Sequence, residues 1–161
     1  MFGLANLGVI HTIFSMIALM AGTVCVLLDR EIDPGTPAGR TFIRTTALTC
    51  VTALGAFRHG SFGKSHVLAL ATLCVLGIAS LAGNKRMFGK AAPYVAAVSY
   101  SLSFFLHLVP RLAETFTCIP IGAPLFASAE DPLLRKTVGA LFVLFLVCVA
   151  MQLRRLHFEL H

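Results

Sequence analysis

Long apolar segments separated by short polar connections dominate the chain. Each segment is close to the ~20 apolar residues that an α-helix needs to cross ~30 Å of hydrocarbon. The second segment is the least apolar because Arg44 lies in its first turns, from where a guanidinium can reach the lipid headgroups. The pattern predicts an all-α integral membrane bundle of five transmembrane helices, forming one domain over residues 1–161. The predicted spans are residues 4–28, 40–57, 66–83, 91–109 and 137–153.

Polar residues and prolines set the predicted ends of these segments. Residues 29–39 read as a charged Pro/Gly turn, and Pro110 is expected to end the fourth span. A longer loop is then expected over residues 111–136, with Cys118 inside it. The first segment has neither a basic leader nor a clear cleavage site of small residues, so we expect it to be retained as a span.

The composition strengthens the membrane assignment. Of 161 residues, 57% are hydrophobic and only 12% are charged, and the mean hydropathy is +0.86. Soluble domains carry about 25% charged residues, so an ordinary water-soluble core is excluded. The net charge of +6 is spread over residues that flank the apolar segments. We therefore expect the lipid bilayer, and no nucleic acid, as the partner of these charges.

Basic residues also predict the orientation in the membrane, because Lys and Arg favour the cytoplasmic side. One set of connections carries eight of them and the other set carries five. The sequence thus predicts a membrane protein with its N-terminus outside and its C-terminus in the cytoplasm. The larger set is Arg30, Arg40, Arg44, Lys85, Arg86, Lys90, Arg154 and Arg155; the smaller is Arg58, Lys64, Arg111, Arg135 and Lys136.

Four of the six histidines fall at the outer face in this arrangement, whereas His157 and His161 fall at the opposite one. Polar residues at helical spacing lead towards them: Ser99 and Ser103 precede one histidine in steps of four, and Ser15 follows another by one turn. Such stripes normally face other helices, because lipid offers polar groups no partner. The predicted cluster is His11, His59, His66 and His107.

Imidazole side chains at a common level suggest a bound cofactor. They bind zinc, copper or iron, and a pair on facing helices can ligate haem. Our leading hypothesis is therefore a metal- or haem-binding redox module held by His11, His66 and His107, with His59 as a fourth metal ligand. Arg111 and Glu114 follow the fourth span and could support the ligands or bind a quinone headgroup. Proton transfer is a third chemistry open to histidine, whose ordinary pKa is about 6.5.

Simpler explanations stand beside this hypothesis. Histidines at span ends are often only interfacial, the Ser/Thr stripes can serve as hydrogen-bonding contacts between helices, and the four cysteines within spans suit small buried positions. No hydrolase, nucleotide or zinc-protease motif occurs, which argues against these classes of enzyme. Whether the protein is an enzyme of another class stays open. The alternative function is a structural or accessory subunit of a larger membrane complex, or a self-associating one. A small transporter or proton channel ranks third, because no Asp, Glu or Lys lies in mid-span.

Several short motifs occur in a characteristic order over the first half to two thirds of the chain. They are an early histidine and a later glycine in the first segment, a Gly-Thr-x-x-x-Arg turn, and Phe-x-x-x-His before the third segment. Their order resembles a family of bacterial inner-membrane proteins catalogued as a domain of unknown function. That family has lysine where Pro34 stands and histidine where Gly39 stands, and it implies a membrane bundle without a stated activity. The matching residues are His11, Gly22, Gly35, Thr36, Arg40, Phe62 and His66.

Overall fold

The computed structural model describes residues 2–55, 63–83, 87–118, 125–126, 128 and 130–160. Within these residues it contains α-helices and short helical turns and no strand, so the predicted all-α class is confirmed. A π-helical turn, η1 (Cys25–Asp29), extends α1, and a 3₁₀ turn, η2 (Gly89–Ala91), precedes α4. The five α-helices described are α1 (Phe2–Val24), α2 (Pro37–Gly55), α3 (Lys64–Gly83), α4 (Ala92–Cys118) and α5 (Pro132–Leu160).

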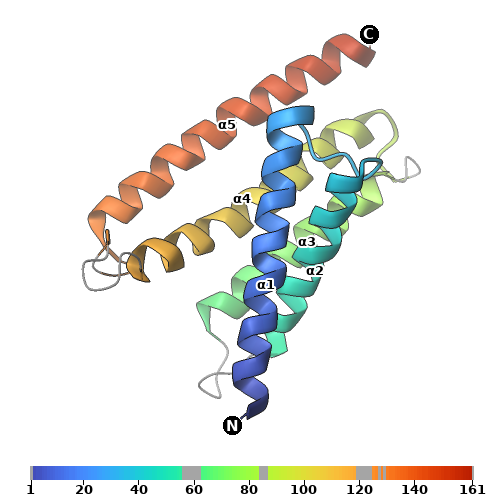
Figure 1. Ribbon diagram of the computed structural model, residues 1–161. Helices are drawn as coiled ribbons and strands as arrows, with labels where there is room; N and C mark the ends of the chain where they lie inside the picture. Colours follow the sequence, from blue (N-terminus) through green and yellow to red (C-terminus); the bar gives the residue numbers. More distant parts are fainter. Residues whose placement is uncertain are drawn as a thin grey trace.

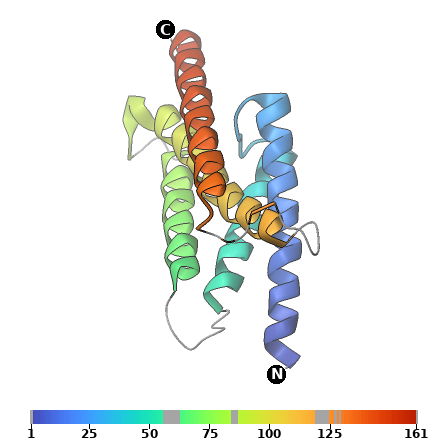
Figure 2. The ribbon, with the colours of Figure 1, turned by 90° about the vertical axis from the view of Figure 1, so that its left-hand side faces the viewer.

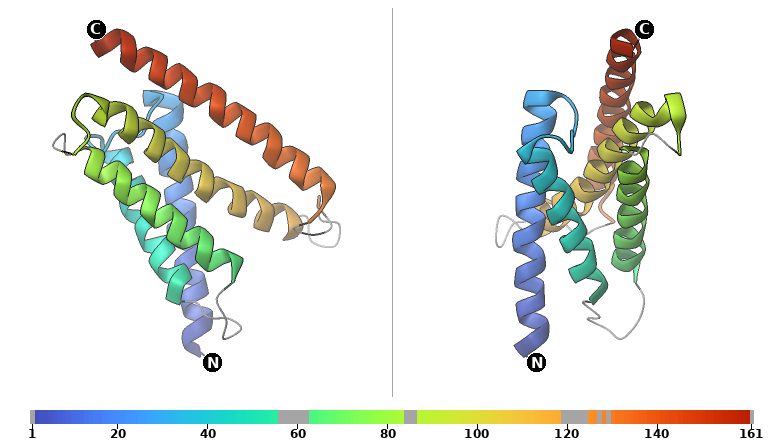
Figure 3. Two further views of the ribbon diagram at one scale, coloured as in Figure 1. Left: turned by 180° about the vertical axis from the view of Figure 1, so that it is seen from behind. Right: turned by 90° about the vertical axis from the view of Figure 1, so that its right-hand side faces the viewer.

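The first three helices lie side by side, and the last two cross them obliquely (Figure 1). Helix α2 packs between α1 and α3, while α4 packs on α3 and also contacts α1. Helix α5 runs back along α4, its main contact in the described part of the chain. The N-terminus and the C-terminus lie at opposite ends of the bundle (Figures 2 and 3).

Four of the described helices are long and apolar enough to cross a membrane, which confirms the prediction of transmembrane helices. They span Leu7–Asp29, Ser65–Gly83, Gly89–Thr117 and Pro132–Leu160. Helix α2 is not among them, although its 19 residues would extend about 28 Å at ~1.5 Å per residue. Its polar residues Thr45, Thr46 and Thr49 are buried against neighbouring helices, so α2 offers less apolar surface to lipid than the other four.

Small side chains form the buried face of α1. Ser15, Ala18, Gly22 and Cys25 are all buried and recur every three or four residues, so they lie along one side of the helix. Such stripes let helix backbones approach closely in membranes. A Cβ atom placed on Gly22 would lie 2.4 Å from a ring carbon of Phe104, so this position has no room for a side chain.

Aromatic rings complete the packing on both sides of α4. Phe104 meets Phe42 of α2 in an edge-to-face contact, with ring centroids 5.9 Å apart. Phe105 points to α5, where its ring lies 5.7 Å from that of Phe142 and 5.0 Å from that of Phe145. The adjacent phenylalanines of α4 therefore join it to two different helices.

A compact turn leads from α1 into α2. Asp33 accepts a hydrogen bond from the Gly35 N–H through Oδ1 at 2.7 Å. The Thr36 hydroxyl caps α2 by accepting from the Gly39 N–H at 3.0 Å, and Pro37 follows at the first helical position. A Cβ atom on Gly39 would lie 1.9 Å from the Asp33 carbonyl oxygen. The close approach leaves no room for a side chain at this position.

One predicted helix end was wrong, and a second helix is longer than its predicted span. Helix α4 does not end at Pro110 but continues to Cys118, which is therefore helical. Pro110 removes one backbone N–H, a loss that membrane helices accommodate through neighbouring helices and local adjustment. Helix α5 covers Pro132–Leu160 and so exceeds the predicted 137–153 at both ends. Its charged ends extend the helix beyond the apolar stretch, because helix formation does not stop where the hydrocarbon does.

We predict that Gly22→Ala destabilises the bundle by about 1–3 kcal/mol, because the added methyl group meets the Phe104 ring in a filled core. Gly77→Ala is the matched control, since a Cβ atom there has no neighbour within 4 Å. It should leave stability unchanged or raise it by up to about 1 kcal/mol. Thermal unfolding of both variants in one detergent measures the difference, and equal melting temperatures would contradict the close packing at Gly22.

Candidate functional site

A cavity of about 120 Å³ opens between the first four helices, toward the end of the bundle where the N-terminus lies. Each of these helices contributes polar side chains to it. The residues that matter below are His11 and Ser15 of α1, Thr49 of α2, and His107, Arg111 and Glu114 of α4. The predicted grouping of His11 with His107 is therefore present as the lining of one cavity.

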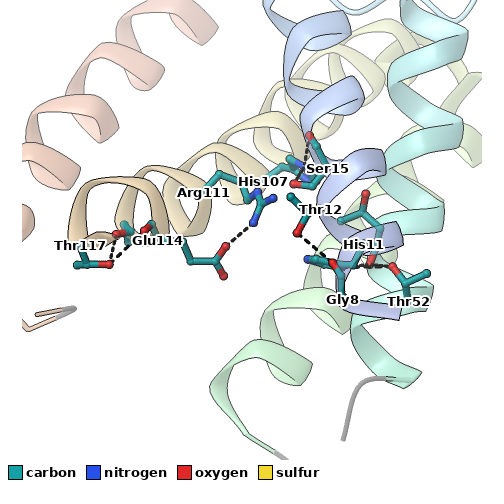
Figure 4. A network of polar contacts seen from close by, with 11 residues as sticks. Gly8, His11, Thr12, Ser15, Thr52, His107, Arg111, Glu114 and Thr117 are labelled. Atoms are coloured by element: carbon teal, nitrogen blue, oxygen red, sulfur yellow. Dashed lines mark hydrogen bonds and ion pairs between the residues drawn. The ribbon is translucent and has the colours of Figure 1, made fainter. Parts of the chain in front are cut away.

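His107 is buried and joins α4 to α1 (Figure 4). Its Nε2 atom lies 3.0 Å from the Ser15 hydroxyl oxygen and 3.3 Å from the Ser15 carbonyl oxygen. Because a carbonyl oxygen only accepts hydrogen bonds, the second contact requires the proton on Nε2. In a neutral ring the lone pair is then on Nδ1.

His11 joins α1 to α2 in the same way. Its Nδ1 atom lies 3.1 Å from the Thr49 carbonyl oxygen and 3.2 Å from the Thr52 hydroxyl oxygen. The Thr52 hydroxyl donates its own proton to backbone carbonyl groups of α2, so its oxygen is an acceptor towards His11. Nδ1 of His11 therefore carries the proton, and Nε2 keeps the lone pair.

His66 has a different environment from the other two histidines. It is buried near the start of α3, where the Gly63 N–H donates to its Nδ1 atom at 3.2 Å. It does not belong to the cavity lining, although its neighbour Ser65 does. His59, the predicted fourth ligand, lies outside the described residues. In the described part of the chain, no group of three or more His, Cys, Asp and Glu side chains is placed to hold a metal ion.

An ion pair stands at the cavity beyond Pro110. Arg111 and Glu114 are three residues apart on α4 and form a salt bridge, with Arg111 largely buried and Glu114 exposed. Both residues line the cavity with His107 because α4 continues as a helix past Pro110. The loop predicted over residues 111–136 did not place these two side chains. The three-residue spacing of their opposite charges is the feature of the sequence that favours a continuing helix.

The hydroxyl groups of Thr45 and Thr49 on α2 donate hydrogen bonds within their own helix and not to other helices. Thr45 donates to the Thr41 carbonyl oxygen and Thr49 to the Thr45 carbonyl oxygen, both at 2.7 Å. These bonds satisfy the hydroxyl groups within α2. The carbonyl oxygen of Thr49, by contrast, holds His11, so α2 contributes to the site through its backbone.

The cysteines do not assemble into a cluster among the described side chains. Cys25 and Cys50 are buried, as predicted, whereas Cys74 is exposed and Cys148 is half-buried. Cys50 lines the cavity. Nothing in the sequence indicates that placement, because Cys50 has no spacing that relates it to a histidine.

No protein-family model, no curated protein and no solved structure matches the chain. The resemblance to the bacterial inner-membrane family therefore stays a prediction.

We predict that the Ser15–His107 contact contributes about 0.6 kcal/mol to stability and at most about 1.7, the average and the maximum measured for hydrogen bonds between membrane helices. A double-mutant cycle with Ser15→Ala and His107→Phe measures this coupling through thermal unfolding. Thr12→Ala is the control for α1, because the Thr12 hydroxyl donates to the Gly8 carbonyl oxygen in its own helix. Its coupling to His107→Phe should be near zero, and a Ser15 coupling that is equally small would argue against the contact.

Proposed function

We propose that this protein is a membrane-embedded binding module whose site is the cavity between His11 and His107, and that its ligand is a transition metal ion. One observation supports this proposal above the others. Two imidazoles from different helices line one cavity, and each is held by a backbone carbonyl oxygen through one ring nitrogen. Metal-binding histidines typically donate their other N–H to such an acceptor, which fixes the ring and leaves the second nitrogen for the metal.

The size of the cavity favours an ion over a larger cofactor. Pockets for drug-sized ligands hold about 300–1,000 Å³, and this cavity holds about 120 Å³. It suits a zinc, copper or iron ion with bound water better than a porphyrin. Arg111 would repel a cation, and its salt bridge with Glu114 offsets that charge in part. Two protein nitrogens plus water would give an open coordination shell, in which the ion supplies any redox or Lewis-acid chemistry.

The distribution of basic residues supports an outward-facing site in the bacterial inner membrane. The turn before α2 and the last part of α5 carry Arg30, Arg154 and Arg155, and they lie together at the opposite end of the bundle. Under the positive-inside rule that end is cytoplasmic. The His11–His107 cavity then faces the outside of the cell, so an ion can enter and leave it without passing through the cytoplasm.

We predict that purified protein binds Cu(II) or Zn(II) at one site and that His11→Ala and His107→Ala each weaken binding by about 100-fold or more, the upper end of the loss seen when even supporting residues of metal sites are removed. Metal analysis and calorimetric titration measure this. His157→Ala at the far end of α5 is the matched control and should bind normally.

His66→Ala separates two versions of the proposal. It should change affinity little if His11 and His107 are the protein ligands, because His66 lies outside the cavity lining. A loss as large as that of His107→Ala would restore the three-histidine set predicted from the sequence. A folded protein that binds none of these ions would argue against the metal site altogether.

A structural subunit of a larger complex is the second candidate, and the placement of α5 favours it. Helix α5 packs chiefly on α4 and exposes apolar side chains along its length, among them Leu133, Val143 and Leu146. For this role we predict co-purification with stoichiometric membrane partners that survives alanine at both His11 and His107 but is lost with Val143→Arg on α5. Partners lost with the two histidine variants and retained with Val143→Arg would contradict it.

A further inference from the structure

A second, larger cavity of about 460 Å³ lies at the opposite end of the bundle, between the end of α1 and the last turns of α5. Three arginines line it, two on α5 and one directly after η1, together with the acid Glu31. Met151 and Phe158 of α5 supply apolar wall. The arginines are Arg30, Arg154 and Arg155.

Hydrogen bonds fix the two walls of this cavity to one another. Gln152 of α5 is buried, and its Oε1 atom accepts from the Ser101 hydroxyl of α4 at 2.8 Å. Its Nε2 atom donates to the Arg30 carbonyl oxygen at 2.7 Å. Arg155 Nη1 donates to the Asp29 carbonyl oxygen at 3.4 Å. The walls of the cavity are thus held in place by hydrogen bonds of Gln152 to α4 and to the segment that follows α1 and η1.

The charge available in the cavity is positive. Arg155 is paired with Glu159 at 2.7 Å. Neither Arg30 nor Arg154 forms a salt bridge with any residue that the structure describes, and the Arg154 guanidinium stands 5.8 Å from the centroid of the Phe158 ring. Among the lining residues, two guanidinium groups outside salt bridges therefore stand against one carboxylate, that of Glu31, with the carboxylates of Asp29, Asp33 and Glu159 nearby but outside the lining. Such a balance favours an anion.

The apolar wall continues directly into the outer surface of the helices. Met151 is 62% exposed and Phe158 is 70% exposed, while Leu27 and Leu28, just before Arg30, are 73% and 76% exposed. In a bilayer these side chains face acyl chains. The cationic cavity therefore opens to the lipid at the level where headgroups begin, rather than to water alone.

We propose that this cavity binds an anionic phospholipid, with the phosphate held by Arg30 and Arg154 and the acyl chains along Met151 and Phe158. Guanidinium groups match phosphate oxygens in bidentate geometry, and basic pockets between membrane helices on the cytoplasmic side bind anionic headgroups. The volume of about 460 Å³ lies within the range of small-molecule sites, about 300–1,000 Å³. Free phosphate would leave the apolar wall without a partner, so the occupant is a lipid.

Glu31 gives the lipid site a distinctive test. Burial raises the pKa of the Glu31 carboxyl above its ordinary value, although the nearby Arg155 partly offsets this shift. The same carboxylate would repel a bound phosphate. Replacing it with the isosteric amide therefore removes a repulsion and leaves the cavity shape intact, so Glu31→Gln should strengthen lipid binding.

The experiment titrates phosphatidylglycerol into the full-length protein in a neutral detergent and follows lipid adducts by native mass spectrometry. Phosphatidylcholine and inorganic phosphate are the comparison ligands. We expect phosphatidylglycerol to bind about tenfold more tightly than phosphatidylcholine, and the Arg30→Gln/Arg154→Gln double variant to lose about tenfold in affinity. Glu31→Gln should bind more tightly than the unchanged protein. Arg135→Gln, at the other end of α5, is the matched control and should bind normally.

Four outcomes would overturn the proposal. They are equal affinity for the two lipids, an equal loss in Arg135→Gln, weaker binding in Glu31→Gln, and full displacement of the lipid by millimolar inorganic phosphate. The last would reassign the site to free phosphate. If the double arginine variant fails to fold, the lipid comparison and Glu31→Gln still decide the matter. None of these measurements involves the His11–His107 cavity, so the result is independent of the proposed metal site.

Discussion

The close approach of α1 to its neighbours is the constraint on which the rest of the structure depends. It exists because the buried face of α1 consists of Ser15, Ala18, Gly22 and Cys25, none of which is large. Between membrane helices there is little hydrophobic driving force, so association relies on packing and on hydrogen bonds. The stripe of small residues provides the packing, because the Phe104 ring fills the space above Gly22. It also provides a hydrogen bond, because it brings Ser15 within reach of His107.

Polar side chains inside the bundle follow from the same constraint, because hydrocarbon offers them no partner. Thr45 and Thr49 of α2 meet this requirement within their own helix, whereas the buried Thr46 hydroxyl has no hydrogen-bond partner among the described residues. His11, His107 and Gln152 meet it across helices, by donating to backbone carbonyl oxygens of other elements. The two cavities form beside these cross-helix bonds. Each cavity thus has a polar wall that is needed for the packing of the helices as well as for any ligand.

The sequence predicted what depends on periodicity and threading. Helical class follows from the apolar segments, and the meeting of His11 with His107 agrees with the predicted alternation of spans, which places the start of the first and the end of the fourth at one face. The small stripe of α1 was also readable, since its members recur every three or four residues.

Other features depend on the competition between a local sequence signal and packing against neighbouring elements, which one sequence does not reveal. Pro110 is a strong signal for a helix end in water, yet α4 continues through it because packing and the turns that follow outweigh one lost hydrogen bond. His66 sits at the predicted level, but the Gly63 N–H engages its ring at the start of α3. The fit of Gly39 against the Asp33 carbonyl oxygen likewise depends on the path of the turn. These outcomes depend on distances of a few ångströms, which spacing along the chain leaves open.

The two ends of the bundle differ in the chemistry that they can support. At one end the imidazoles share a cavity of about 120 Å³ with an ion pair. At the other end two guanidinium groups stand at a cavity of about 460 Å³ that continues into the apolar surface. A small space with nitrogen lone pairs favours an ion, and a larger cationic space that continues into apolar surface favours an amphiphile. Helix α1 contributes to both, through His11 and Ser15 at one end and through the turn at Arg30 at the other. An anionic lipid at Arg30 would therefore hold α1 and α5 together at the end where α5 otherwise depends on Gln152 and Arg155 for its contact with the α1–α2 turn.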